Sequence, residues 1–423
     1  MYIKKIDITN IRSIQKFTME FKNPPGWHVL IGDNGAGKSS VIRAISLALI
    51  GPEEALGLRA DWRDWLSQNK DLGRIRIDIQ KQDIDKHTGR QAKLTKYLVP
   101  NVIQFKRLGE IVELSVVKTL KVDPYKYNWG RGKGWFSAAF GPYRRFAGGN
   151  QEWTKVFYSQ PKLGAHLSAF GEDIALTETL EWLVKLNYKI LENKESGVIL
   201  NDLKKLINSK DFLPHNTKIH NVSSDGVLFK DGNGIQISVN QLSDGYRSIL
   251  SLTFELIRQL VRVYDENKVF ANIRENEMII NLPGVVLIDE IDAHLHPTWQ
   301  TRIGQWFTKY FPNIQFIVTT HSPLICRACE NGTIWRLAAP GSEDESKQIL
   351  GDDRNRLIFG NVLDAYGTEI FGGNVTISVE AVDKKEELVQ LSKKKTAGKI
   401  STQEENKLQE LRKTFSTDDK VEL

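Results

Sequence analysis

Residues 32–39 read Gly-Asp-Asn-Gly-Ala-Gly-Lys-Ser, and the spacing of the glycines, the lysine and the serine suits binding of a phosphate chain. Glycines let the backbone close around phosphate oxygens, and the N–H groups at a following helix start attract anions. The lysine can reach the outer phosphates, and the hydroxyl of Ser39 can bind Mg²⁺. We therefore expect nucleotide contacts from Asn34, Gly35, Ala36, Gly37, Lys38, Ser39 and Ser40.

Two later apolar segments also end in residues that could act on a phosphate. Residues 284–288 are apolar and lead into Asp289 and Glu290, which predicts two acids at the carboxyl edge of a sheet. There Asp289 would hold Mg²⁺ and Glu290 would act as general base toward an attacking water. Residues 315–320 form a similar segment, and His321 after it could hydrogen-bond the γ-phosphate.

A second anion site is predicted where Leu-Ser-Asp-Gly, residues 242–245, precedes a helical pattern over residues 249–260. Ser243 and Gly245 would lie at the start of that helix. Since the chain already has a phosphate loop, this site is best explained as serving the ATP of a second copy. The expected assembly is a homodimer that encloses two ATP molecules. A simple helix N-cap at Ser243 is the alternative.

These residues require an α/β fold, in which a sheet and its helices present the loops at one edge. Residues 27–31 predict a buried strand before the phosphate loop, and residues 40–49 predict a helix after it. We expect an ATPase head from residues 1–55 and 236–345, an inserted lobe from 56–235, and a helical tail from 346–423. Further predicted elements are strands near 3–9, 17–21, 75–79 and 109–117, helices at 177–193 and 200–209, a hairpin over 226–239, and two tail helices broken at 397–398.

The composition of the chain indicates its cellular compartment. The 423 residues carry a formal net charge of +6 and two cysteines, and no apolar run reaches membrane-spanning length. Few cysteines predict a reducing compartment, hence the cytoplasm and no membrane partner. Cys326 and Cys329 form a C-x-x-C pair, for which two small helix residues are favoured over zinc or redox use.

The basic, aromatic stretch from Lys118 to Arg145 is a candidate contact surface for a nucleic acid. It interleaves cations with rings, an arrangement that suits phosphates and stacked bases. The members singled out are Tyr125, Tyr127, Trp129, Arg131, Lys133, Trp135, Tyr143, Arg144 and Arg145. The alternatives are a packed aromatic core with a solvated rim, or contact with the nucleotide itself.

The four motifs, in this order and with a long insert after the first, resemble the ABC-type ATPase heads of the SMC, RecF and OLD class. Residues 242–245 stand where that class has its Leu-Ser-Gly-Gly signature, with Asp244 in place of a glycine. Asn-Ile-Arg at 10–12 resembles the Asn-x-Arg element, which implies that Arg12 lies near the nucleotide. The run from Asp289 to Pro297 is similar to OLD proteins and to the ATPase subunits of Septu and retron anti-phage systems. Gln151 and Gln160 are candidates for the Q-loop glutamine.

The resemblance implies an ATPase that uses ATP and Mg²⁺ and acts in anti-phage defence. OLD proteins carry a nuclease domain after the ATPase, but the residues after His321 show no matching acidic cluster. A nuclease would then be a separate polypeptide that this ATPase controls. The alternative from another class is a RecF- or SMC-like DNA-repair ATPase. A transporter ATPase is disfavoured by the insert and by the altered signature.

Overall fold

The computed structural model describes most of the chain, in two compact units, residues 1–360 and 361–423. The described residues are 1–58, 61–87, 98–117, 122–130, 132–144, 159–171, 177–192, 198–209, 212–224, 226–275, 277–342, 344–362, 365 and 379–415.

An antiparallel sheet of five strands, ordered β2-β1-β4-β5-β6, forms one layer of the first unit. Ile6 and Ile8 show why these segments are strands, because alternate side chains face the core and are fully buried. The strands are β1 (Tyr2–Ile11), β2 (Ile14–Glu20), β4 (Leu72–Gln80), β5 (Val99–Leu108) and β6 (Ile111–Val116).

A second sheet of six strands, ordered β14-β13-β3-β12-β11-β7, carries the sequence motifs. All neighbours are parallel except β14, which pairs antiparallel with β13. The strands are β3 (Gly26–Ile31), β7 (Ser137–Phe140), β11 (Gly284–Ile288), β12 (Ile314–Thr319), β13 (Ile334–Arg336) and β14 (Lys347–Ile349). The loops after β3, β12, β11 and β7 therefore leave the same edge of the sheet, as parallel strands require.

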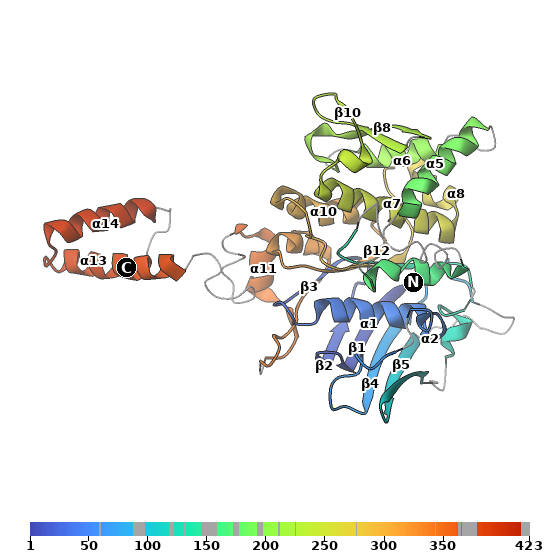
Figure 1. Ribbon diagram of the computed structural model, residues 1–423, viewed down its shortest axis with the longest axis horizontal. Helices are drawn as coiled ribbons and strands as arrows, with labels where there is room; N and C mark the ends of the chain where they lie inside the picture. The colour runs from blue at the N-terminus through green and yellow to red at the C-terminus, as the bar shows by residue number, and fades with distance from the viewer. Residues whose placement is uncertain are drawn as a thin grey trace. The chain divides into compact units, whose positions relative to one another are not determined.

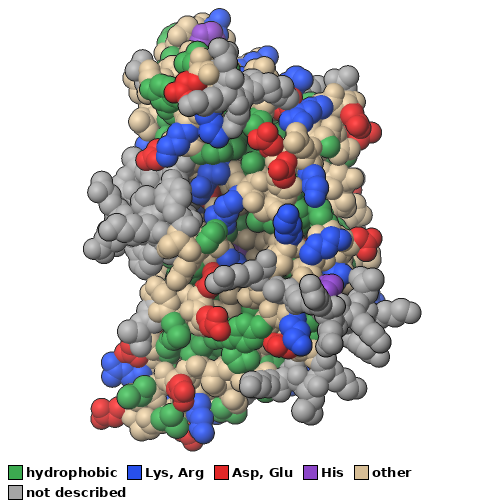
Figure 2. Space-filling model, turned by 90° about the vertical axis from the view of Figure 1, so that its right-hand side faces the viewer, with side chains coloured by type: hydrophobic (Ala, Val, Ile, Leu, Met, Phe, Trp, Pro, Cys, Tyr) green, Lys and Arg blue, Asp and Glu red, His purple; other side chains and the backbone are tan. Residues whose placement is uncertain are grey.

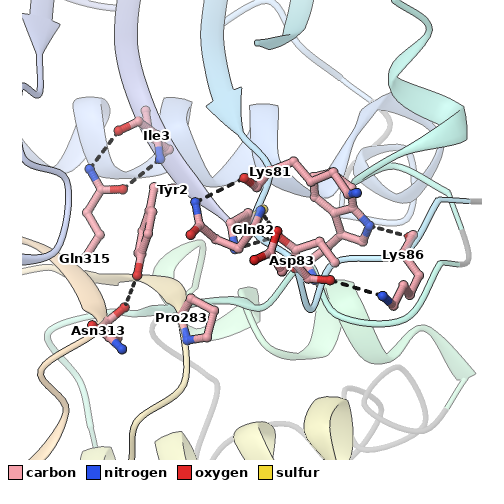
Figure 3. Close-up of polar contacts among 12 residues, drawn as sticks. Tyr2, Ile3, Lys81, Gln82, Asp83, Lys86, Pro283, Asn313 and Gln315 are labelled. Atoms are coloured by element: carbon pink, nitrogen blue, oxygen red, sulfur yellow. Dashed lines mark hydrogen bonds and ion pairs between the residues drawn. The ribbon is translucent and has the colours of Figure 1, made fainter. Parts of the chain in front are cut away.

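Helix α1 (Lys38–Ile50) lies between the two sheets and contacts strands of both (Figure 1). Ten of its residues are buried, including Val41, Ile45 and Leu49. The sheets also meet directly, where the buried Gln315 of β12 bonds both backbone groups of Ile3 at 2.7 and 3.0 Å (Figure 3). This arrangement makes one continuous core around α1.

Helices α7 and α10, which Figure 1 shows side by side, contact the parallel sheet on its other face, and a small sheet packs on α5 and α6. The helices are α5 (Thr177–Leu191), α6 (Val198–Ile207), α7 (Asp244–Tyr264), α10 (Pro297–Tyr310) and α11 (Gly351–Phe359). Short helices are α2 (Pro52–Ala55), α4 (Pro161–Gly164), α8 (Glu266–Val269) and α9 (Ala271–Arg274). The small sheet has the order β10-β9-β8, from β8 (Lys218–Ser223), β9 (Gly226–Lys230) and β10 (Gln236–Ser238).

The segment predicted as an inserted lobe, residues 56–235, contributes strands to both large sheets. Strands β4 and β5 continue the sheet that β1 begins, and β7 pairs with β11 at the other sheet's edge. The α/β class is confirmed, while the predicted boundaries at 55, 235 and 345 stay predictions. The helices at 177–193 and 200–209 and the hairpin at 226–239 were predicted to within a few residues.

Both cysteines lie in the 3₁₀ helix η5 (Pro323–Asn331), where Cys326 and Cys329 are fully buried. Burial raises the pKa of each thiol above its ordinary value. Within the described ranges, no cluster of three or more His, Cys, Asp or Glu side chains could hold a metal ion. The positions of the two cysteines in a buried helix agree with the interpretation as small helix residues.

The second unit contains the predicted helical hairpin. Helices α13 (Val379–Thr396) and α14 (Thr402–Thr414) are joined through Gly398, whose φ of 66° suits glycine. Leu391, Leu408 and Leu411 form its small core. Across the part of the chain that the structure describes, no helix is long and apolar enough to cross a bilayer.

Candidate nucleotide site

The phosphate loop joins β3 to α1, as predicted. Gly37 precedes the helix with a φ of 93°, and a Cβ there would lie 3.1 Å from the Ser13 hydroxyl. Only glycine combines that backbone with that contact. Asp33, Asn34 and Gly35 are exposed, so the front of the loop is open at the start of α1.

The ammonium group of Lys38 lies within its own loop. Its Nζ donates to the carbonyl oxygens of Gly32 at 2.8 Å and Asp33 at 3.0 Å, and the side chain is 6% exposed. Burial lowers its pKa, while Glu290 and Asp289 oppose that shift, because their negative charge favours the ammonium. The lysine and the two predicted acids therefore belong to one electrostatic site.

Thr319 of β12, which the sequence analysis did not single out, fixes both acids at the end of β11. Its hydroxyl donates to Asp289 Oδ1 at 2.6 Å and accepts from the Glu290 backbone N–H at 2.8 Å. Asp289 is only 1% exposed. The sequence signal for this residue was its place at the end of an apolar segment, two residues before His321.

Glu290 has an unusual backbone. Its φ is 46°, in the left-handed region that non-glycine residues seldom adopt. Such a conformation costs of order 1–3 kcal/mol and is retained where surrounding contacts determine it. Its side chain is half-buried, so the carboxylate is directed by the turn while remaining open to a ligand.

A buried arginine donates hydrogen bonds to the backbone of the same turn. Arg144 Nη1 donates to the carbonyl oxygens of Asp289 at 2.8 Å and Gly141 at 2.9 Å, and its Nη2 donates to Glu290 O at 3.0 Å. Its Nε bonds the Ser248 hydroxyl on α7 at 3.1 Å. Burial lowers the pKa of Arg144 to about 10, opposed by the nearby carboxylates of Asp289, Asp292 and Glu290. Arg144 thus ties the acid-bearing turn to α7.

Replacing Arg144 with glutamine is expected to lower ATP turnover at least about tenfold and the free energy of unfolding by about 3–5 kcal/mol, because buried carbonyls lose their partners. ATP affinity should change little, since Arg144 bonds the acid turn rather than the phosphate loop. Arg144→Lys keeps the charge but lacks the planar guanidinium. Its turnover and stability should therefore lie between those of the wild type and those of Arg144→Gln. Calorimetry, urea unfolding and steady-state turnover would measure these effects. Wild-type stability and turnover in Arg144→Gln would contradict this role.

The Leu-Ser-Asp-Gly segment begins α7. Ser243 is exposed at the N-cap position, and its hydroxyl makes no capping hydrogen bond. Gly245 is buried against the loop after Glu290, where a Cβ would lie 2.8 Å from the carbonyl oxygen of His294. The serine hydroxyl is therefore presented outward at the start of a long helix.

The two remaining predicted site residues, His321 and Arg12, come from different strands' ends. His321 follows β12 and is exposed. Arg12 has a φ of 51° in the turn between β1 and β2, and the next residue, Ser13, packs on Gly37. The Arg12 guanidinium lies 3.6 Å from Asp64 and 5.8 Å from the Trp65 ring. Their predicted nucleotide contacts stay predictions.

The structure buries part of the basic, aromatic stretch. Tyr127, Trp135 and Arg144 are at most 8% exposed, because the rings join the core and the arginine bonds backbone carbonyls. Lys133 and Tyr143 are exposed, while Lys118, Arg131, Arg145 and the Q-loop candidate Gln151 lie outside the described residues. A packed aromatic core is therefore found at Tyr127 and Trp135, while a contact role for the other members stays a prediction. On the face drawn in Figure 2, Lys and Arg gather centrally but alternate with acids.

Comparisons with known proteins agree with this site. A family model described as "AAA ATPase domain" matches residues 1–106. A second, "AAA domain, putative AbiEii toxin, Type IV TA system", matches residues 151–327. The first of these segments includes the phosphate loop, and the second includes Asp289 and Glu290.

Two known proteins are similar to this chain in sequence. Septu protein PtuA from Bacillus mycoides (strain KBAB4) is 28% identical over 340 residues, which are 79% of this chain and 40% of PtuA. Retron Ec83 probable ATPase from Escherichia coli is 37% identical over 164 residues, 38% of this chain and 26% of that protein. The chain therefore spans well under half the length of these two relatives. This similarity agrees with the resemblance of the chain's motifs to ABC-type ATPase heads.

The chain is also similar to a solved structure. The SMC head domain from Thermotoga maritima covers 83% of this chain and 100% of its own, with 13% identity and a TM-score of 0.41.

Proposed function

We propose that this chain binds and hydrolyses ATP as a subunit of a bacterial anti-phage defence complex, and that it controls a separate nuclease. The observation that carries the ATPase part is geometric: Lys38 follows β3, Asp289 and Glu290 follow β11, and these parallel strands flank β12, so all three residues lie at the same edge of the sheet. The defence part is supported by the likeness to a Septu protein and to a retron ATPase.

The roles follow from chemistry at each position. Loop N–H groups and the start of α1 would bind the phosphates, and Lys38 would turn from its own carbonyls toward them. Asp289 and Ser39 would hold Mg²⁺, which favours oxygen ligands and neutralises phosphate charge. Two protein ligands suffice, because Mg²⁺ sites on nucleotides are completed by water and phosphate oxygens.

Glu290 would take the proton of the attacking water as general base. Its half-buried carboxylate and strained φ of 46° support a directed role. His321 would hydrogen-bond a γ-phosphate oxygen from the end of β12. Arg12 would approach from the turn that packs on Gly37.

The dimer is supported by Ser243, whose exposed hydroxyl at the start of α7 makes no capping bond. A helix start of this length attracts an anion, and a symmetric pair would place each start on the partner's ATP. Arg144 would then carry the effect of the partner's nucleotide from α7 to Glu290.

We place this assembly in the cytoplasm, with no membrane partner and with nucleic acid as a ligand of the complex.

Ser243→Arg tests the dimer. The larger side chain should exclude the partner's γ-phosphate and lower turnover at least about tenfold, while ATP affinity at the phosphate loop stays near the wild-type value. Asn233→Arg is the matched control, because it adds the same charge at an exposed hairpin turn. Calorimetry and steady-state turnover across protein concentrations would measure both.

Mixing Ser243→Arg with Lys38→Ala protein gives a sharper version of this test. A mixed pair keeps one intact composite site, so random pairing should restore roughly a quarter of wild-type turnover. Normal turnover by Ser243→Arg alone at low protein concentration would show that one chain hydrolyses ATP by itself.

A further inference from the structure

A cavity of about 680 Å³ lies at the carboxyl end of α1, where Figure 1 shows α2 beginning. Its walls come from the turn after α1, the segment from Tyr125 to Trp135, α4 and the last turn of α7. We call it the α1-end cavity. The lining residues that matter here are Gly51, Glu54, Asn128, Trp129, Lys162 and Arg262.

This cavity is separate from the nucleotide site. Lys38 begins α1 and Ile50 ends it, so a rise of 1.5 Å per residue separates the two by about 18 Å. Its volume lies within the range of about 300–1,000 Å³ typical of small-molecule sites.

One wall is a fixed aromatic surface. The Trp129 indole N–H donates to the carbonyl oxygen of Ala48 at 2.9 Å. Its ring packs on Gly51, where a Cβ would come within 3.0 Å of the ring. Tyr125 meets the same ring edge-on, with ring centres 5.4 Å apart. A ring held this way offers a ready stacking surface for a planar heterocycle.

Two cations and one acid line the polar end. The Lys162 ammonium donates to Asn128 O, and the Arg262 guanidinium donates to Pro161 O. Each side chain has further donors beyond that bond. Glu54 acts electrostatically on both cations, and its buried Oε2 has no hydrogen-bond partner. With Glu53 and Glu54 ionised, the two cations and two acids that line the cavity carry no net charge, which disfavours a highly charged ligand.

Asn128 is the clearest sign that a partner is missing. It is 1% exposed, and neither its Nδ2 nor its Oδ1 has a hydrogen-bond partner. Buried amides are normally paired, since an unpaired buried polar group costs of order 1–3 kcal/mol. Both amide atoms are closed to solvent, so a ligand reaches them when the side chain turns toward the cavity that Asn128 lines, where an amide can pair with N6 and N7 of an adenine.

We propose that the α1-end cavity is a second nucleotide site that binds an adenine mononucleotide. The base stacks on Trp129 and pairs with the Asn128 amide. The phosphate is bound by Lys162 and Arg262, and the acids Glu53 and Glu54 disfavour the larger negative charge of a triphosphate. This site is independent of the proposed hydrolysis, since it shares no residue with the phosphate loop.

The test uses the full chain carrying Lys38→Ala, which removes binding at the phosphate loop, with AMP as the probe in titration calorimetry. One AMP per chain is expected. Ribose 5-phosphate, which has no base, adenosine, which has no phosphate, and inosine monophosphate, which has no N6 amino group, should each bind at least tenfold more weakly. ATP should also bind more weakly than AMP.

Lys162→Met added to Lys38→Ala should weaken AMP binding at least tenfold, with the matched control Lys133→Met, an exposed lysine outside the cavity, leaving it unchanged. Melting temperatures of both variants check the fold, and inosine monophosphate tests the site without any further substitution. Absence of saturable AMP binding would mean that only water fills the cavity, and AMP binding unaffected by Lys162→Met would place it elsewhere. Either result overturns the proposal. ATP turnover in chains with Lys38 intact tests the proposed function separately.

Discussion

Lys38→Ala is expected to abolish measurable ATP binding. The ammonium lies within bonding distance of two loop carbonyls and is partly stabilised by Asp289 and Glu290, so it is already placed where a phosphate would take over those contacts. Removing a buried charge that pairs with a ligand costs about 3–5 kcal/mol, which is at least a hundredfold in affinity. Titration calorimetry with ATP and Mg²⁺ would measure the loss.

The matched control for this experiment is Lys133→Ala, because Lys133 is exposed and lies outside the loop. Its ATP affinity should equal that of the wild type. Unchanged ATP affinity in Lys38→Ala would remove the phosphate loop from the proposed mechanism.

Glu290→Gln is expected to leave ATP bound while lowering hydrolysis by about 10²–10⁴-fold, the usual contribution of a general base. Glutamine is nearly the same size and keeps the backbone bonds to Thr319 and Arg144, but its amide cannot accept the water's proton. Since ATP would persist, the enclosed dimer should accumulate. Single-turnover kinetics and size-exclusion chromatography with ATP would report both effects.

Glu330→Gln, an exposed acid at the end of η5, is the control for the loss of one charge. It should hydrolyse ATP at the wild-type rate. Wild-type hydrolysis by Glu290→Gln would mean that a different residue activates the water.

Much of the parallel sheet could be predicted from the sequence because its strands are short apolar runs that end in reactive residues. Trp27–Ile31, Gly284–Ile288 and Gln315–Thr319 each stand out from their surroundings, and the phosphate loop has its own glycine pattern. The tail hairpin could also be predicted, because Gly398 separates two helical patterns that carry leucines.

Other features depended on contacts between distant residues. Strand β7 is only Ser137–Phe140, too short to show a period, and it is a strand because it pairs with β11. In the sequence Arg144 looks like one more cation in a basic stretch, yet its partners other than Gly141 lie 104 to 146 residues further along the chain. The left-handed backbone of Glu290 follows from Thr319 and Arg144 rather than from its own residue type. The α1-end cavity could not be predicted either, because its walls come from segments far apart in the chain.

The parallel sheet also has a consequence for how the protein is made. Strand β3, which leads into the phosphate loop, has β12 and β13 as its two neighbours, and both are encoded about 280 residues or more after it. At about 5–20 residues per second of translation, β3 waits on the order of 15–60 s for a partner strand. Throughout that interval an apolar strand with two unpaired edges is open to aggregation. The yield of active protein should therefore depend on chaperones and growth temperature more than the stability of the finished fold would suggest.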